Sequence, residues 1–272
     1  MRRRRHLVVW QKQAIFAGCA SALAMFLLPR PCFAGPPFLT DDPVPVDYGH
    51  WEIYGFSIGA FVKGAAAGMA PAIEVNNGTL PNVQLHFIAP LAFSRSNGMS
   101  TEFGPGDLEF GVKYRFLTAE PDDWWPQIGI FPMLEVPTGN AERNLGTGST
   151  HAFLPLWLQK DSGKWMTYGG GGYWINPGPG NKNYWFAGWV LQRQVTDSLA
   201  LGGEIFHQTS FATGGPGSPC FPLGSKDTTG FNLGGTYDFD QNHHLLFSAG
   251  RALQNASTTN AFSYYLALQW TF

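Results

Sequence analysis

Hydrophobic and polar residues alternate with a period of two along much of the chain. At the C-terminus, residues 262, 264, 266, 268, 270 and 272 are apolar or aromatic, whereas the residues between them are mostly small or polar. Segments 107–116, 199–206 and 231–239 repeat this pattern, and the second face of 107–116 is charged apart from Gly111. Successive side chains of a β-strand point to opposite faces, so the pattern predicts strands with one apolar and one polar face.

The pattern predicts twelve strands of about ten residues each, of which the second is the least regular because Pro71 and an Asn-Asn-Gly run interrupt it. The predicted ranges are 50–61, 69–76, 82–93, 106–117, 126–137, 150–160, 164–175, 184–195, 198–209, 227–239, 243–252 and 261–272. Strands of this length with an apolar face towards lipid and a polar face towards a lumen can cross a bilayer. An open sheet edge would leave backbone groups unpaired in lipid, so we expect a closed all-β, single antiparallel transmembrane β-barrel.

The connections between the strands differ in length. Residues 161–163, 196–198 and 240–242 are short turns, and they alternate with longer links at 138–149, 176–183, 210–226 and 253–260. Outer-membrane barrels have short periplasmic turns and long extracellular loops, which predicts that both termini are periplasmic. Tryptophans near the predicted strand ends are candidates for the two aromatic girdles: Trp124, Trp125, Trp165 and Trp270 on the periplasmic side, and Trp174 and Trp185 on the other.

The first 34 residues predict secretion. Arg2–Arg5 and Lys12 precede the uncharged apolar run 14–28, and Cys32-Phe33-Ala34 offers small residues at the positions that a signal peptidase requires. We expect a cleaved signal peptide (1–34), then a Pro-rich segment (35–49) and the barrel (50–272), located in the bacterial outer membrane of a Gram-negative cell. Terminal Phe272 resembles the C-terminal signal that the barrel-assembly machinery recognises. The expected partners are therefore that machinery, outer-membrane lipid, lipopolysaccharide and a small-molecule solute.

Charge and cysteine content exclude other classes. The leader contains six of the 17 basic residues and no acidic residue, so the rest of the chain has 11 basic and 19 acidic residues and a net charge of about −8. Nucleic-acid binding is not expected, because a phosphate backbone requires a basic face. After cleavage Cys220 would be the single cysteine, which excludes an intramolecular disulfide.

The side chains that face the predicted lumen are the candidates for the solute path. On this register they include the charged residues Asp107, Glu109, Lys113, Arg115, Glu135, Glu204 and Asp238. The same register places Phe131, Met133, Leu154, Leu156 and Phe206 inside, which would make the lumen partly apolar. Opposed charges could line a water path or close it by pairing, and a lumen of twelve strands lies between filled and open barrels.

Catalytic and metal-binding patterns are weak. His207 and Ser210 would lie on opposite faces of a strand, and His151 has no evident acid partner. The histidines at 50, 86, 151, 207, 243 and 244 are interpreted as rim residues. There is no His-x-His or Cys-x-x-Cys spacing, so neither a metal nor a cofactor is expected, and the chain is interpreted as a non-enzyme.

Three motifs resemble a known family. They are Pro36–Pro43 followed by Tyr48-Gly49-His50-Trp51-Glu52, the strand Gly106–Phe116, and Glu135-Val136-Pro137-Thr138-Gly139. They are similar to the outer-membrane family linked to the MetA pathway of phenol degradation. The resemblance implies a transporter associated with hydrophobic or aromatic compounds, and no site residue is carried over from it.

The Pro-rich segment 35–49 has two interpretations, an unstructured periplasmic leader or a plug inside the barrel. In a plug, Asp41 and Asp42 could contact lumen bases such as Lys113 or Arg115. The favoured function is a channel for passive uptake of small, hydrophobic or aromatic solutes. The alternatives are an outer-membrane lipid or lipid A hydrolase and a structural barrel with a sealed lumen.

Overall fold

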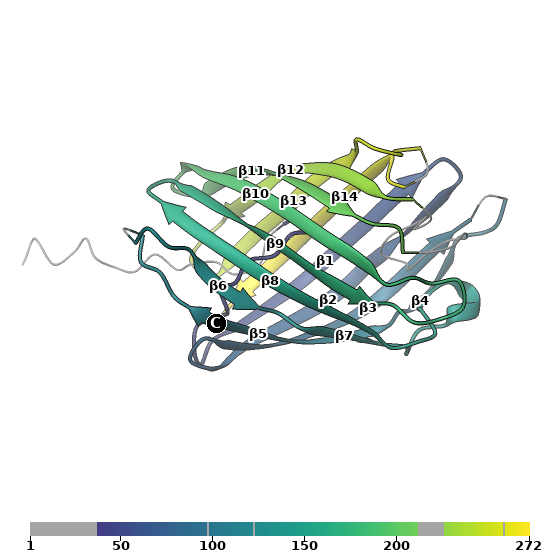
Figure 1. Cartoon of the computed structure of the whole chain (residues 1–272), viewed down its shortest axis with the longest axis horizontal. Coiled ribbons are helices and arrows are strands. Elements are labelled where there is room, and N and C mark those ends of the chain that lie inside the picture. The colour runs from purple at the N-terminus through teal and green to yellow at the C-terminus, as the bar shows by residue number, and fades with distance from the viewer. Residues whose placement is uncertain (1–36, 97, 122, 212–225, 258) are drawn as a thin grey trace, which may run out of the picture. The chain divides into compact units, whose positions relative to one another are not determined.

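A computed structural model describes residues 37–272 apart from 97, 122, 212–225 and 258. The predicted signal peptide and Cys220 lie outside these residues. Fourteen strands form one antiparallel sheet (Figure 1). They are β1 (Trp51–Val62), β2 (Ala65–Leu80), β3 (Val83–Arg95), β4 (Glu102–Pro105), β5 (Leu108–Leu117), β6 (Gln127–Ile130), β7 (Met133–Val136), β8 (His151–Ser162), β9 (Trp165–Ile175), β10 (Tyr184–Thr196), β11 (Leu199–Gln208), β12 (Thr228–Asp238), β13 (His243–Ala252) and β14 (Phe262–Thr271).

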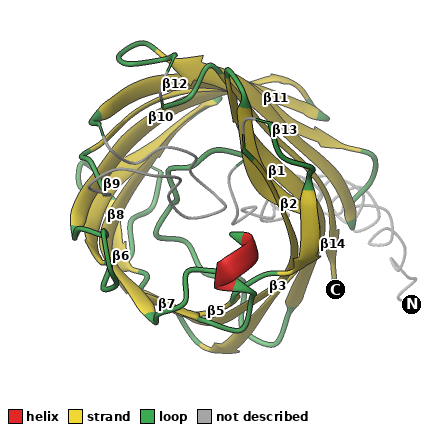
Figure 2. Cartoon of the chain, turned by 90° about the vertical axis from the view of Figure 1, so that its right-hand side faces the viewer, coloured by secondary structure: helices red, strands yellow, loops and turns green. Residues whose placement is uncertain are grey.

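The sheet closes on itself as a barrel of twelve strands, as predicted. β4 and β5 both pair with β3, and β6 and β7 both pair with β5 and β8, so each couple is one barrel strand with a break. The register between β1 and β14, from Glu52↔Thr271 to Phe61↔Phe262, closes the ring that Figure 2 shows along its axis. Closure leaves no edge strand to be paired by another chain or exposed to lipid.

Both ends of the barrel sequence meet at one rim. The N–H of Trp51 donates to the carbonyl of Phe272 (3.1 Å), and the N–H of Phe272 donates to the carbonyl of Trp51 (2.9 Å). This rim, called the terminal rim below, also holds the tight turns around Asn82, Gly163, Asp197 and Gln241. Asn82 and Gly163 have positive φ angles of 62° and 59°, which short turns between paired strands require.

The alternation of loop lengths holds in the second half of the chain and fails in the first. The opposite rim carries the long links 137–150, 176–183, 209–227 and 253–261, and the first of these contains the 3₁₀-helix η1 (Ala141–Arg143). In the first half, β1 and β2 are joined there by the two-residue turn Lys63-Gly64, whereas the terminal rim carries the nine-residue link 118–126. The turn-forming residues of the sequence therefore predicted the positions of the connections better than their relative lengths.

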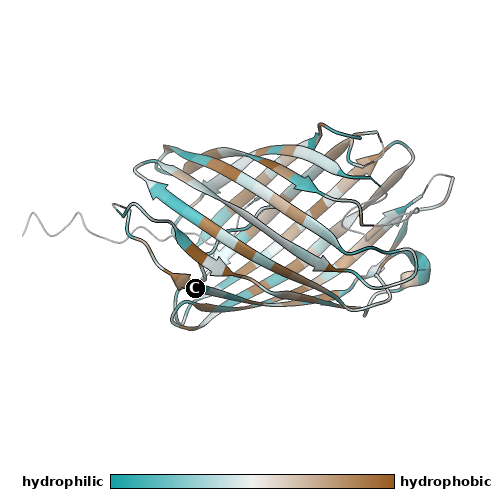
Figure 3. Cartoon of the chain, viewed as in Figure 1, coloured by the Kyte–Doolittle hydropathy of each residue, from teal (hydrophilic) through white to brown (hydrophobic). Residues whose placement is uncertain are grey.

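Outward and inward faces follow the predicted alternation on most strands. On β5 the apolar residues Phe110, Val112, Tyr114 and Phe116 are exposed, while Lys113 is buried. On β14 Leu266 and Leu268 are exposed, while Ala267 and Gln269 are buried. Hydrophobic positions recur along the strands in Figure 3. An apolar outer band of this kind is what a lipid-facing barrel requires.

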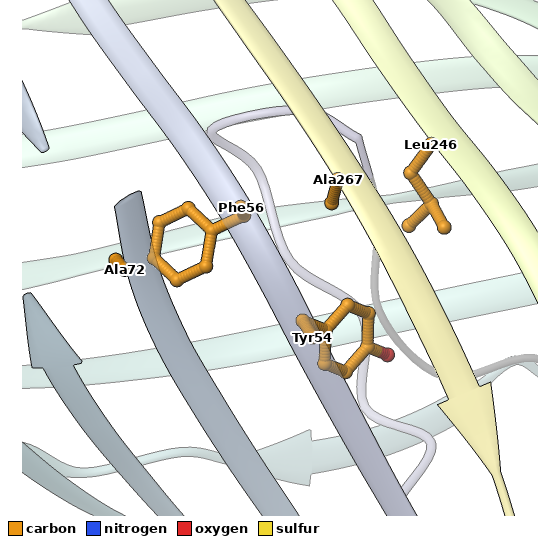
Figure 4. Close-up of a cluster of buried hydrophobic side chains, with 5 residues drawn as sticks. All are labelled: Tyr54, Phe56, Ala72, Leu246 and Ala267. Carbon is orange, nitrogen blue, oxygen red and sulfur yellow. The ribbon is translucent and has the colours of Figure 1, made fainter. Parts of the chain in front are cut away.

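Inward side chains pack on one another across the wall. Tyr54 and Phe56 of β1 lie with Ala72, Leu246 and Ala267 in one buried cluster, and Figure 4 shows these five side chains on adjacent strands. Small residues at 72 and 267 leave room for the two rings beside them, in the way that large and small side chains alternate inside narrow barrels. Among the described residues there is no helix long and apolar enough to cross a membrane.

Candidate functional site

The chain before β1 lies inside the barrel. In this stretch, called the luminal segment (residues 37–47), every residue up to Val46 except Leu39 and Asp41 is buried, and Thr40 has no exposed surface. Pro37, Pro43 and Pro45 lack N–H donors, so the segment cannot join the β-ladder as an extra strand. Side chains of the barrel wall hold it instead, so each contact can be removed by substituting a single residue.

Glu204 on β11 binds the first part of the luminal segment. Its Oε1 accepts hydrogen bonds from the N–H and the hydroxyl of Thr40, both 2.6 Å, and its Oε2 accepts one from the N–H of Leu39 at 3.3 Å. Asn232 Nδ2 donates to the same Oε2 at 2.6 Å. A buried carboxylate needs several donors to offset its lost hydration, and two of the residues that supply them belong to the segment.

Lys113 on β5 binds the next part from the facing wall. Its Nζ lies 2.9 Å from Asp41 Oδ1 and 3.7 Å from Asp42 Oδ1, and its side chain is only 2% exposed. The same Nζ lies 4.9 Å from the centroid of the Phe131 ring. The prediction that Asp41 and Asp42 contact a lumen base is therefore confirmed for Lys113. Arg115, the alternative partner, donates instead to Asn82 and Gln127 near the terminal rim.

The two ends of the segment are also attached. The Ser248 hydroxyl donates to the carbonyl of Pro37, and the N–H of Val46 donates to Gln84 Oε1 at 2.9 Å. Tyr48 then forms a bridge with Gly78 of β2 just before the barrel begins. The segment thus runs from the terminal rim into the lumen between opposing walls.

Wall glycines make space for it. A Cβ on inward-facing Gly188 of β10 would overlap the Thr40 hydroxyl, and one on Gly78 would overlap the carbonyl of Asp47. At Gly129 a Cβ would lie 3.0 Å from Pro43. These contacts explain three glycines by close approach of the luminal segment.

Gly188→Val is therefore expected to displace Thr40 from Glu204. The thiol of Thr40→Cys, in a chain that also carries Cys220→Ser, should react several-fold faster with a water-soluble maleimide when Gly188→Val is present. The neighbouring Ala187→Val is the control, because Ala187 faces outward on the same strand. Equal reaction rates in all three proteins would mean that the segment tolerates a side chain at 188.

A second polar cluster lies beside the segment. His86 Nδ1 is 2.7 Å from Asn76 Oδ1 and 3.4 Å from Glu74 Oε1, and its Nε2 is 3.1 Å from Glu109 Oε1. Both ring nitrogens face acceptors, as suits the doubly protonated imidazolium. The interpretation of the histidines as rim residues is wrong for His86, which is a buried lumen residue. His151 and His244 lie near the two rims, at the starts of β8 and β13, but their side chains are buried.

The predicted charged residues do not form one group. Glu109, Lys113 and Glu204 face the occupied lumen, and Glu135 lies beside Glu109 in the β5–β7 register. Asp107 instead accepts from the N–H of Gly139 and from the N–H and hydroxyl of Thr147, so it holds the link between β7 and β8. Asp238 pairs with His244 near the terminal rim at 2.8 Å. The alternation of apolar and polar residues predicted which side chains face inward, but it did not predict how far along the barrel axis each of them lies.

The wall between β7 and β11 is aromatic on the lumen side. Phe131, Phe153, Trp157, Phe186 and Phe206 form one buried cluster, with Leu39 and Trp174 packed against it. Towards the opposite rim the rings continue as stacked pairs, Phe153–Trp174 at 4.7 Å and Trp174–Tyr184 at 5.7 Å between centroids.

Three expectations for this wall are corrected. Leu154 and Leu156 are 53% and 45% exposed and point outward, because β8 has the opposite phase to the one predicted. Trp174 stacks in the lumen rather than in an outer girdle, whereas Trp185 on the next strand is exposed as expected. The predicted inward positions of Phe131 and Phe206 are confirmed.

Two cavities lie against the luminal segment. The larger, of about 240 Å³, is bounded by apolar side chains from β1, β2, β3, β7 and β14 and by Phe131, together with Glu74, His86, Glu109 and Lys113. The smaller, of about 50 Å³, lies towards the opposite rim beside Phe206, Phe211 and Asn260. Phe38, Leu39, Ile58 and Tyr265 border both cavities. Phe38 and Leu39 therefore separate two parts of one lumen.

Comparison with known proteins assigns the chain to a family. A family model described as "Putative MetA-pathway of phenol degradation" matches residues 59–270. The chain belongs to this family. The crystal structure of an outer membrane channel from Pseudomonas putida F1 superposes with a TM-score of 0.66 at 18% identity, covering 85% of this chain and 98% of that one. The NanC porin gives a TM-score of 0.52 at 8% identity, covering 82% and 98%. No curated protein sequence matches the chain.

Within this family member, the sequence identified part of the luminal site. Asp41, Asp42, Lys113, Glu109 and Glu204 were named from their pattern. Thr40, His86 and Asn232 were missed, and so was the accommodating Gly188. An inward-facing glycine among large inward residues, such as Gly188 between Phe186 and Val190, was the available signal that another segment approaches the wall.

The described residues contain no group of three or more His, Cys, Asp or Glu side chains placed to hold a metal ion. His207 Nδ1 lies 2.9 Å from the Thr229 hydroxyl, while Ser210 is engaged through its own N–H by Asp227. The pairing of His207 with Ser210 that a serine hydrolase would use is thus not made.

Proposed function

We propose that this family member is an outer-membrane channel for the passive uptake of small apolar or aromatic solutes. The observation that carries the proposal is a lumen cavity of about 240 Å³ that is lined largely by apolar and aromatic side chains, among them Phe131 of the aromatic wall. An apolar cavity of ~150 Å³ already takes up benzene, so a one-ring solute fits the larger space. The similar Pseudomonas putida protein is an outer membrane channel, and the family is described by phenol degradation; both support the same class of function.

The polar groups of the cavity are placed to orient such a solute. Side chains of Phe56, Ile58, Met69 and Ile88 form an apolar side, and Glu109 and Glu74 lie on another side, 21% and 17% exposed. Ligand sites in proteins commonly combine a mostly apolar lining with a few placed polar groups. A ring that carries one hydrogen-bond donor, such as a phenolic hydroxyl, matches this division.

Uptake by intact cells tests the proposal. Cells that produce the protein should take up radiolabelled phenol and toluene several-fold faster at early times than cells without it, because lipopolysaccharide slows the direct passage of apolar solutes. Arabinose is the polar comparison, and its uptake should change less. Equal early rates for every solute with and without the protein would contradict the proposal.

A sealed structural barrel is the second candidate, since the luminal segment occupies the lumen and is bound from two walls. The two candidates differ in whether any solute crosses the unaltered protein. The uptake experiment therefore decides between them.

A further inference from the structure

The larger cavity has more acidic than basic side chains around it. The ionisable side chains that line it, or that pair with this lining, are Asp41, Asp42, Glu74, His86, Glu109 and Lys113. Four carboxylates against two bases leave a net charge of −2 with both bases protonated. Because charges interact strongly in a protein interior of low dielectric, this excess favours a cation in the cavity and disfavours an anion.

The acidic groups reach the cavity, whereas the basic groups are almost fully covered. The side chains of Glu74 and Glu109 are 17% and 21% exposed, and that of Asp41 is 22% exposed. Those of His86 and Lys113 are only 4% and 2% exposed. A solute in the cavity therefore meets carboxylate oxygens more readily than it meets the positive charges.

The charged donors already have partners, and the charged acceptors have capacity left. Lys113 Nζ donates to Asp41 at 2.9 Å, and both ring nitrogens of His86 face oxygen atoms. Within the described part of the chain, Glu74 and Glu109 form their hydrogen bonds and ion pairs through Oε1 alone. The Oε2 atom of each carboxylate is thus available to accept a hydrogen bond from a solute.

The two available oxygens flank an apolar position of the wall. Glu74 of β2 is paired with Ile88 of β3, and Ile88 is paired in turn with Glu109 of β5. The three residues therefore lie side by side at one level of the barrel, and all three line the cavity. A ring that packs over Ile88 has a carboxylate on either side of it.

The size of the cavity suits one ring with a short arm. An apolar cavity of ~150 Å³ takes up benzene, so the 240 Å³ available here leaves room for one more carbon and an ammonium group. Met69, Phe131 and Met133 supply further apolar lining for the ring. An ammonium group forms a hydrogen bond with a carboxylate that is roughly twice as strong as a bond between neutral groups.

We propose that this cavity is a subsite for one-ring solutes that carry an ammonium group, and that Glu74 and Glu109 select the cation. The inference rests on the proposed function and names a substrate class within it. Neutral ring alcohols and phenols bind the same subsite more weakly, because their hydroxyl is an uncharged donor. Ring carboxylates are excluded, because they add a negative charge to an acidic site whose charged donors are already paired.

Three solutes of nearly equal size test the proposal. Benzylamine, which is protonated at neutral pH, benzyl alcohol and benzoate carry a cationic, a neutral and an anionic group on the same ring. Titration calorimetry of the purified protein in detergent, with empty micelles as the blank, measures their binding. Benzylamine should bind about tenfold more tightly than benzyl alcohol, since hydrogen bonds to charged groups contribute more than neutral ones, and benzoate should not bind.

Substitution of the two carboxylates tests which residues make the selection. Glu74→Gln with Glu109→Gln preserves the shape of both side chains, and the affinity for benzylamine should fall to that for benzyl alcohol. Glu109→Gln alone should cause part of this loss, and it tests the site even where the double variant does not fold. Asp197→Asn is the matched control, because it removes one negative charge from an exposed turn at the terminal rim and should leave all three affinities unchanged.

The outcomes separate this inference from the proposed function. Equal affinities for the three solutes, tighter binding of benzoate, or a preference for benzylamine that survives both glutamine substitutions would overturn the cationic subsite. If cells take up phenol and toluene faster with the protein while the purified protein does not prefer benzylamine, the subsite is overturned and the proposed function stands. If uptake is not accelerated while benzylamine binds in a manner that depends on Glu74 and Glu109, the proposed function fails and the subsite stands as a binding site.

Discussion

Deletion of residues 38–46 is expected to raise the single-channel conductance of the barrel several-fold. Phe38 and Leu39 border both cavities, so their removal joins two separated spaces into one continuous lumen. The contacts to Glu204 and Lys113 disappear at the same time. The barrel should persist, because the pairing of β1 with β14 does not involve the deleted residues.

Planar-bilayer recordings of the deleted and intact proteins provide the measurement. The deletion leaves residues 1–37 in place, so the predicted cleavage site and export are unchanged. A matched control replaces residues 212–220 of the link between β11 and β12 with an equal number of Gly and Ser residues, which alters the chain outside the luminal segment. Equal conductance of the deleted and intact proteins would show that the segment does not limit passage.

Lys113→Met is expected to release the luminal segment without unfolding the barrel. Removing one partner of a buried ion pair leaves the other charge uncompensated, at a cost of about 3–5 kcal/mol. Asp41 and Asp42 would avoid this cost by leaving the lumen for water. The expected results are a higher conductance and a rapid reaction of the Thr40→Cys thiol, in the Cys220→Ser chain, with a water-soluble maleimide.

Two comparisons make this result specific to charge. Adding Asp41→Asn and Asp42→Asn to Lys113→Met removes the uncompensated carboxylates, so conductance should fall back towards the unmodified value. Arg143→Met breaks the ion pair between Arg143 and Glu102. Because the Arg143 side chain is half exposed, the free energy of unfolding should change by no more than ~1 kcal/mol, and the conductance should stay unchanged. An unaltered conductance in Lys113→Met would mean that Glu204 alone retains the segment.

Several features of the molecule were predictable because they depend on local patterns. The period of two located all twelve strands and the outward faces of β5, β11, β12 and β14, since side-chain alternation is a property of the strand itself. Turn residues located the hairpins for the same reason. The phase of β8 was wrong because its inward face carries Phe153 and Trp157, which are as apolar as the outward Leu154 and Leu156.

The luminal site was predictable only in part. Charge complementarity predicted that Asp41 and Asp42 contact a base in the lumen. It did not distinguish Lys113 from Arg115 as that base. Height along the barrel decided between them, because Arg115 lies two residues nearer to the terminal rim and binds Asn82 there. Height depends on the stagger of the whole ring of strands, and no single strand contains that information.

By itself the sequence determined the class of fold, the strand inventory, the apolar outer face and the charges that can pair in the lumen, because each follows from residue type and spacing along one strand. Only the tertiary structure decided that residues 37–47 lie in the lumen, that Glu204 and Lys113 bind them from facing walls, and that His86 is buried between two carboxylates. These features join residues far apart in the chain, and their physical cause is the closure and register of the barrel, which bring such residues to the same height.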